Sequence, residues 1–340
     1  MLALNETIDR PYPMAARIGA PEIKPELRMK VLVATGALSR SDSAVLRAHA
    51  IARGLGAQLL LLHVVDSARP LRAARRRNAL AHSILDAQVR DLGDDSIQTS
   101  IRSGRPYETI AKVATEWDAD LIILGPYRKR FGDELRGATA ERIASKAGRP
   151  VLVVNQEFTR PYQHVLLTAD LSRMSAGIAG VTKQLGLLER SRAFVVHALE
   201  DARPAMLYMA GVNKSEVGKY QQALRQVALN EIDAQLSSAG LNSAHFRVLP
   251  PQISPIRAIE QVAKRTDSDL VVVGSSRFPV FKRLFLGSVS NEVLRRAKHD
   301  VLLVSPAAAR RARHRASAIG HASIGGDNAT ADARASLMRP

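Results

Sequence analysis

Residues 120–125 read DLIILG, and the same pattern returns at residues 269–274 as DLVVVG, 149 positions later. In both segments an unbroken apolar run follows an aspartate and ends at a glycine. Continuous apolarity, without alternating polar residues, is typical of a strand that is buried on both faces, as in a parallel sheet covered by helices. The two segments therefore predict an α/β fold that is present twice in the chain.

Working outward from these strands, three further segments recur in the same order. They are VLVAT (31–35) as VLLTA (165–169), LHV (62–64) as VHA (196–198), and PVLVV (150–154) as DVLLV (300–304). The offset is 134 for the first two pairs and 150 for the last, so the second copy contains an insertion. We place this insertion in residues 203–222.

Segments with apolar residues at helical spacing alternate with the apolar runs, at residues 43–55, 107–117, 218–239 and 256–264. Strands that alternate with helices predict an α/β fold of two tandem, doubly wound, open parallel-sheet domains. We expect the following organisation: a flexible segment (1–28), a first domain (29–155), a linker (155–162), a second domain (163–306) and a basic disordered tail (307–340).

The amino-acid composition excludes some classes of function and favours others. The chain of 340 residues has no cysteine, which excludes disulfides, thiolate metal sites and cysteine nucleophiles. Its apolar runs are too short to span a bilayer and its first residues do not resemble a signal peptide, so we expect a cytoplasmic protein without a membrane partner. The 49 Lys and Arg against 32 Asp and Glu give a net charge of +17, which favours anionic partners such as nucleotides or nucleic acid.

The loops that follow the first and fourth strands are the expected binding region, because ligands of open α/β sheets bind beyond the carboxyl ends of the strands. After the fourth strand of the second copy, Gly274 begins a loop that ends at Gly287 and Ser288, where an amphipathic helix starts. Backbone N–H groups at a helix start, together with a hydroxyl, can bind an anion. Glycines at these positions could equally serve only a turn and a helix start.

In these residues the chain resembles the universal stress proteins, in a tandem form that covers about residues 29–154 and 163–306. The resemblance implies that both domains have a Rossmann-like fold of the adenine-nucleotide α-hydrolase-like type. Members that bind ATP have Gly, two residues, Gly, nine residues, Gly and then Ser or Thr. Gly274, Gly287 and Ser288 match this spacing, but Arg277 replaces the middle glycine. The arginine could clamp the phosphates with its guanidinium, or it could reshape the loop and block the site.

The resemblance also assigns the adenosine end of the second-copy site. Asp170 matches an aspartate after the first strand, and Ala198 matches the residue whose backbone faces the adenine. In the first copy Gly36 replaces that aspartate, and Ala138 replaces the hydroxyl residue. We therefore expect the first copy to have a degenerate site.

The resemblance implies a stress-response regulatory module that binds ATP, with or without Mg²⁺, mainly through its second domain, with at most slow hydrolysis. It also implies a homodimer, an unidentified protein partner, and pairing of the two domains through their last strands, 151–154 and 301–304. The alternative is a nucleotide-free protein whose basic surface and tail engage nucleic acid or acidic partners. His63 and His197 recur at matching strand positions, and we interpret them as hydrogen-bonded core residues rather than metal ligands.

Overall fold

The computed structural model describes residues 28–36, 42–66, 71–125, 135–198, 203–241, 245–249, 254–275 and 289–317. The first repeat consists of β1 (Lys30–Ala34), α1 (Ser43–Leu55), β2 (Gln58–Asp66), α2 (Leu71–Leu92), β3 (Gln98–Gly104), α3 (Pro106–Glu116), β4 (Leu121–Leu124), α4 (Leu135–Ala147) and β5 (Val151–Val153). The second consists of β6 (His164–Thr168), α5 (Arg173–Gln184), β7 (Arg192–Ala198), α6 (Arg203–Met209), α7 (Lys214–Ser238), β8 (His245–Leu249), α8 (Pro255–Arg265), β9 (Leu270–Gly274), α9 (Val289–Arg296) and β10 (Asp300–Val304). None of these helices combines the length and the apolarity needed to cross a membrane.

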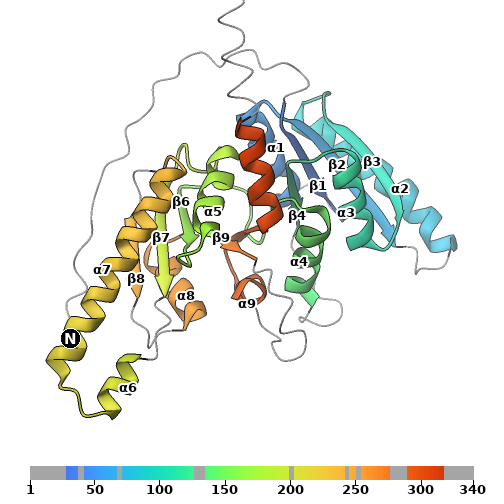
Figure 1. Cartoon of the computed structure of the whole chain (residues 1–340). Helices are drawn as coiled ribbons and strands as arrows, with labels where there is room; N and C mark the ends of the chain where they lie inside the picture. The colour runs from blue at the N-terminus through green and yellow to red at the C-terminus, as the bar shows by residue number, and fades with distance from the viewer. Residues whose placement is uncertain are drawn as a thin grey trace, which may run out of the picture.

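The strands of both repeats form one ten-stranded sheet in the order β3-β2-β1-β4-β5-β10-β9-β6-β7-β8 (Figure 1). Pairing is parallel within each repeat, whereas β5 and β10 pair antiparallel at the centre, with Leu302 opposite Leu152. The predicted doubly wound α/β fold is confirmed. The predicted pairing of the two domains through their last strands is also confirmed.

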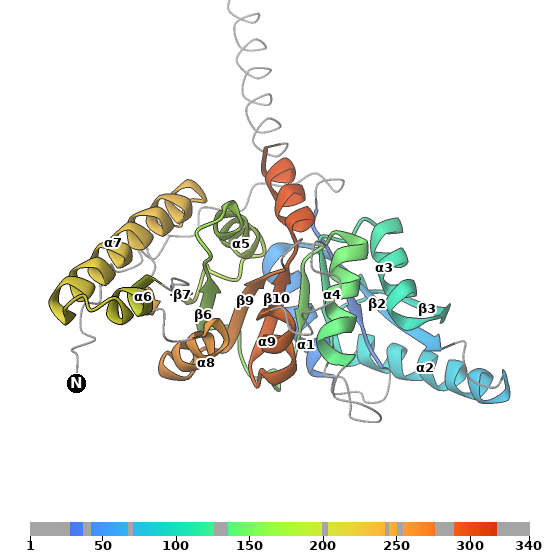
Figure 2. The same ribbon diagram turned by 60° about the horizontal axis from the view of Figure 1, so that its bottom comes forward.

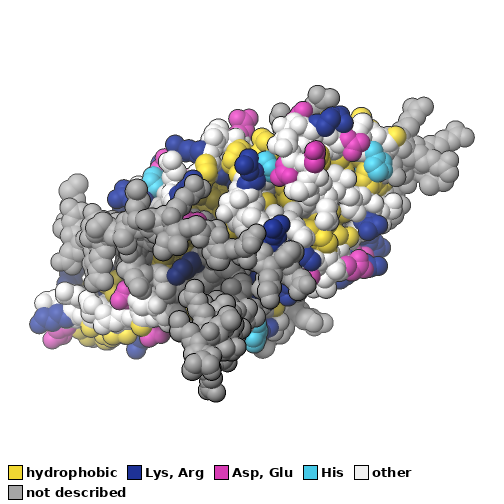
Figure 3. Space-filling view, turned by 90° about the horizontal axis from the view of Figure 1, so that it is seen from above, with side chains coloured by type: hydrophobic (Ala, Val, Ile, Leu, Met, Phe, Trp, Pro, Cys, Tyr) yellow, Lys and Arg dark blue, Asp and Glu magenta, His cyan; other side chains and the backbone are white. Residues whose placement is uncertain are grey.

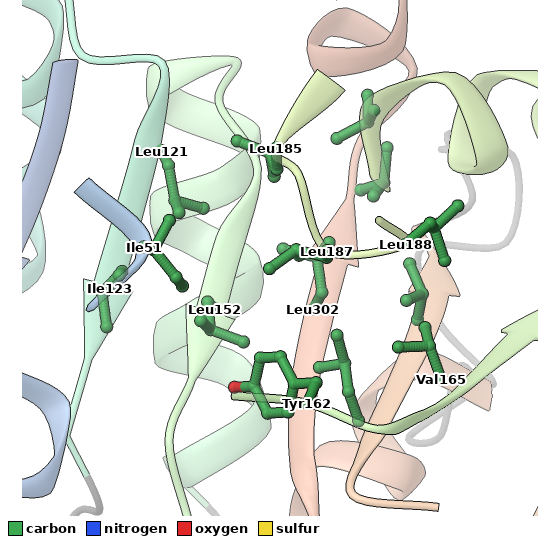
Figure 4. Close-up of a cluster of buried hydrophobic side chains, with 14 of the residues drawn as sticks. Ile51, Leu121, Ile123, Leu152, Tyr162, Val165, Leu185, Leu187, Leu188 and Leu302 are labelled. Carbon is green, nitrogen blue, oxygen red and sulfur yellow. The ribbon is translucent and has the colours of Figure 1, made fainter. Parts of the chain in front are cut away.

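Helices cover both faces of the sheet. The cluster on one face joins the sheet to α1, α2, α5 and α7, and the cluster on the other joins it to α3, α4, α8 and α9 (Figures 1 and 2). Successive residues of β1 alternate between these clusters: Val31 and Val33 face one, and Leu32 faces the other. Figure 4 shows one cluster running without a break from Leu121 of the first repeat to Val165 of the second. The two domains therefore share their hydrophobic core.

A buried polar cluster holds the two repeats together. Asp300, at the start of β10, is fully buried, and Arg47 of α1 is 4% exposed, with its Nε 3.4 Å from Asp300 Oδ2. The Tyr162 hydroxyl donates to the same oxygen at 2.6 Å, and the Arg47 guanidinium lies 3.9 Å from the centre of the Tyr162 ring. The backbone N–H groups of Asn155 and Gln156 donate to Asp300 Oδ1 at 2.7 and 3.0 Å. The linker is thus fixed by this carboxylate, in contact with both domains.

The segment that follows β10 differs from the expected disordered tail. Residues 306–317 form a helix that packs Ala308 and Ala309 into the core. Its basic side chains reach the first repeat, where Arg311 Nη2 is 2.8 Å from Asp118 Oδ2 and Arg315 Nη1 donates to Asp120 Oδ1 at 2.9 Å. Alanine has the highest helix propensity, and these ion pairs add a tertiary anchor. Residues 318–340 and 1–27 lie outside the described part of the chain.

Replacing Arg47 with Met should leave the Asp300 carboxylate buried without its cation. We expect the free energy of unfolding to fall by about 3–5 kcal/mol, since removal of one partner of a buried ion pair leaves an uncompensated charge. Urea denaturation measures this loss. The control is Lys112→Met, because Lys112 pairs with Glu116 on the surface, and it should change stability by about 0.5 kcal/mol or less. Equal effects of the two variants would contradict this role for Arg47.

Tyr162 predicts a specific dependence of stability on pH. Burial, and next the charge of Asp300, raise the pKa of Tyr162 well above its usual value of 10.0. Because an unfolded tyrosine ionises near pH 10 while the folded one stays protonated, the stability from this group is complete below pH 10 and falls as pH rises further. The difference in unfolding free energy between the wild type and Tyr162→Phe should therefore be constant up to about pH 9 and shrink above pH 10. A constant difference up to pH 11 would contradict the shift.

Candidate functional site

A cavity of about 620 Å³ opens at the carboxyl ends of β6, β7 and β9 in the second repeat. β7 and β9 lie on opposite sides of β6, so the winding direction of the sheet reverses at this point. That reversal is where open α/β sheets bind their ligands. The volume lies within the range of about 300–1,000 Å³ that is usual for small-molecule sites.

Three of the six predicted site residues line this cavity: Asp170, Ala198 and Gly274. The other three, Arg277, Gly287 and Ser288, lie outside the described residues. The described chain enters the intervening loop at Ser275 and resumes at Val289, and both of these residues line the cavity. The sequence motif and the cavity thus coincide wherever the structure describes both.

Asp170 is exposed at the rim, directly after β6. Its Oδ1 accepts hydrogen bonds from the backbone N–H of Ser172 (3.0 Å), the Ser172 hydroxyl (2.6 Å) and the Ser175 hydroxyl (3.3 Å). Ser172 in turn caps α5 by accepting from the N–H of Met174 at 3.1 Å. These bonds fix the orientation of the carboxylate. None of the described residues donates to its Oδ2, which leaves that oxygen available to a ligand hydroxyl.

The two recurrent histidines have structural roles. His197 Nδ1 lies 2.8 Å from the carbonyl oxygen of Ala169, and His63 Nδ1 lies 3.0 Å from that of Thr35. Each imidazole therefore ties the end of its repeat's second strand to the residue that follows the first strand. The predicted hydrogen bonds are confirmed for both histidines; His197 is buried and also lines the cavity, whereas His63 is half-buried. In the second repeat this bond also fixes Ala198 at the cavity wall.

Gly274 is required by the close approach of α5. A Cβ atom at this position would lie 3.2 Å from Ile178 Cδ1 and 3.6 Å from Met174 Cε, and both of those side chains line the cavity. Any larger side chain would displace these neighbours or fill the space that a ligand needs. The glycine therefore keeps the cavity open.

Helices α6 and α7 form one wall of the cavity, which the sequence did not reveal. Arg203 lies in the predicted insertion (203–222), whereas Leu224, Val227 and Ala228 line the cavity from the part of α7 that follows it. The guanidinium of Arg203 stacks 5.4 Å from the centre of the Tyr220 ring. The change of repeat offset located this insertion, but offsets carry no information about where the inserted helices pack.

The first repeat places a negative charge where the second has apolar side chains. Asp42 caps α1, with Oδ1 accepting from the N–H of Ala44 at 2.9 Å and Oδ2 from the Thr35 hydroxyl at 2.7 Å. Its Oδ1 would lie 3.7 Å from a Cβ on Gly125, the counterpart of Gly274. A fixed carboxylate at this point disfavours a bound phosphate, which agrees with the expected degenerate site.

Fold and site together define a tandem α/β protein of the doubly wound class, with its cavity in the second domain. The model of the universal stress protein family matches this chain twice, over residues 28–155 and 161–305. The chain therefore belongs to the universal stress protein family, as a tandem two-domain member.

Solved structures with the same fold include a universal stress protein from Archaeoglobus fulgidus DSM 4304, which is 16% identical to this chain. The match covers 82% of this chain and 97% of that one, with a TM-score of 0.56. A functionally unknown protein from Pseudomonas aeruginosa PAO1 is 19% identical and covers 85% of this chain and 98% of that one, with a TM-score of 0.54. A universal stress protein in complex with cAMP is 21% identical and covers 38% of this chain and 97% of that one, with a TM-score of 0.31.

Proposed function

We propose that the second domain binds an adenine nucleotide, ATP, and that the chain acts as a nucleotide-responsive regulatory module of the stress response. The observation that supports this most strongly is the cavity, which brings together Asp170, Ala198 and Gly274, three residues far apart in sequence that the family motif assigns to one ligand. Membership of the universal stress protein family supports the stress-response role.

In this proposal the ligand extends across the ends of three adjacent strands. The base contacts the backbone of Ala198 at the end of β7, and Asp170 Oδ2 accepts a hydrogen bond from a hydroxyl of the ribose. The phosphates lie beyond Gly274, near the start of α9, where the helix dipole favours an anion. Arg277, Gly287 and Ser288, outside the described residues, complete the phosphate contacts.

We propose binding with little or no turnover. The described carboxylate nearest the cavity, that of Asp170, is oriented by two serines at the adenosine end, away from the phosphates that a hydrolytic base would need to reach. The described residues contain no group of three or more His, Asp or Glu side chains that could hold a metal ion. Mg²⁺ would therefore enter with the nucleotide, coordinated mainly by phosphate oxygens.

The alternative, a nucleotide-free protein that engages nucleic acid through its basic surface and tail, has weaker support. Arg311 and Arg315, which belong to the presumed basic tail, pair with carboxylates of the first domain. On the described part of the face in Figure 3, basic and acidic side chains are interspersed instead of forming one basic stripe. Binding through phosphate contacts would weaken steeply with salt.

Calorimetric titration of ATP into the full chain tests the proposed function. We expect one site per chain, with affinity reduced at least tenfold by Gly274→Val, because the added side chain would push against Ile178 and occupy the cavity. Asp170→Asn should weaken binding several-fold, since the amide oxygen can still accept from Ser172 and Ser175 while an NH₂ group replaces the Oδ2 acceptor and the negative charge is lost. The control is Gly218→Val on α7, where a Cβ atom would meet nothing within 4 Å.

Two results would contradict the proposal. One is the absence of binding to the wild type at millimolar ATP. The other is equal affinity of the Gly274→Val and Gly218→Val variants, which would place the nucleotide elsewhere. Loss of binding on raising salt, with no effect of either variant, would favour the surface-binding alternative.

A further inference from the structure

A side chain of the first domain reaches the cavity wall of the second. Glu141 lies on α4, which packs against α9 beside the central strands β5 and β10 (Figure 2). Its Oε1 accepts a hydrogen bond from the Ser290 hydroxyl at 2.6 Å, and its Oε2 accepts one from Asn291 Nδ2 at 3.2 Å. Ser290 is 2% exposed and lines the cavity. One carboxylate thus holds two consecutive residues in the first turn of α9.

The contact between the two repeats is asymmetric, because equivalent positions carry different side chains. Glu141 and Asn291 occupy the same place in the two repeats, 150 positions apart, as do Ala140 and Ser290. The repeats therefore meet here through equivalent residues. At these two positions the second domain has a hydroxyl where the first has a methyl group, and the first domain has a carboxylate where the second has an amide. The domain with the degenerate site supplies the acceptor, and the domain with the cavity supplies the donors.

We propose that Glu141 is a positioning residue for the nucleotide site of the second domain, so that the site depends on both repeats. This inference rests on the proposed function. Glu141 fixes the turn of α9 that borders the phosphate end of the cavity before the nucleotide arrives. Since the Ser290 hydroxyl donates a hydrogen bond to Glu141, its role is to anchor the turn, and the anchored turn directs the positive end of the α9 dipole toward the phosphates. Hydrogen bonds to an ionised acceptor are stronger than neutral ones, which suits an anchor.

The carboxylate has an opposing effect, because its negative charge repels the phosphates of the ligand. A Gln at this position keeps an acceptor for Ser290 and, with the amide of Asn291 reoriented, a partner for that residue too. The Gln side chain has no negative charge. Glu141→Gln therefore removes the repulsion of the phosphates and keeps the positioning contacts, whereas Glu141→Ala removes both.

The first experiment measures the affinities of the full chain for ATP and for adenosine. Glu141→Ala should weaken ATP binding by about tenfold, the size expected for loss of a hydrogen bond to a charged group, and should leave adenosine affinity unchanged. Glu141→Gln should bind ATP within about threefold of the wild type. Ser290→Ala should weaken ATP binding, and the double variant with Glu141→Ala should be no weaker than the worse single variant, because both remove the same contact.

The matched control is Glu260→Ala, which removes a contact to the other end of the same helix, where Glu260 Oε1 is 3.7 Å from Arg296 Nη1. It should leave ATP affinity unchanged. If Glu141→Ala binds ATP as the wild type does, or if both variants weaken binding equally, the positioning role is overturned.

A second measurement needs no nucleotide. Amide hydrogen exchange in residues 290–294 of the free protein should be faster in Glu141→Ala than in the wild type, and near the wild-type rate in Glu141→Gln. Unchanged exchange would overturn the anchoring step even if the wild type binds ATP. Faster exchange in Glu141→Ala, together with a wild type that fails to bind ATP, would overturn the proposed function while the anchoring of α9 stands.

Discussion

The structure depends on the burial of one carboxylate, that of Asp300, at the start of the central strand β10. A fully buried charge is tolerated only when it is paired and fully hydrogen-bonded. Its partners come from three places: Arg47 from α1 of the first domain, Tyr162 from the end of the linker, and two backbone N–H groups from the beginning of the linker. The repeats must therefore fold against each other for this charge to be satisfied, which makes the pairing of β5 with β10 part of the fold and not a later association.

The placement of the helices beside the cavity depends on this pairing of β5 with β10. Because β10 pairs with β5 on one side and β9 on the other, α9 lies beside α4 of the first repeat. The helix over residues 306–317 completes the junction, since it packs on α5 near Gly177 and pairs its arginines with Asp118 and Asp120. The first domain thus contacts α9 directly through α4, and its Asp118 and Asp120 hold the helix that packs on α5.

The sequence predicted what depends on local, repeated patterns. Buried strands such as DLVVVG are recognisable because both faces are apolar, and the repeat of these runs predicted both the tandem fold and the loops that surround the cavity. The edge strands β3 and β8 gave no such signal. Gln98–Gly104 is mostly polar and largely exposed, as an edge strand can be. Contacts between distant residues could not be predicted either: nothing near Arg47 indicates that it pairs with Asp300, and nothing in residues 203–238 indicates that their helices form a cavity wall.

The two copies differ in where an acidic side chain lies relative to the first residue of the helix that follows their first strand, α1 or α5. In the second repeat the cap of α5 is Ser172, a neutral hydroxyl, and the carboxylate of Asp170 precedes it at the exposed rim. In the first repeat Asp42 is itself the cap of α1, so its charge lies beside Gly125. A capping aspartate stabilises its helix through the dipole and the free N–H groups. In the first repeat this stabilisation places a carboxylate beside Gly125, whereas in the second repeat the cap of α5 is neutral and the counterpart glycine, Gly274, faces the apolar side chains of Ile178 and Met174.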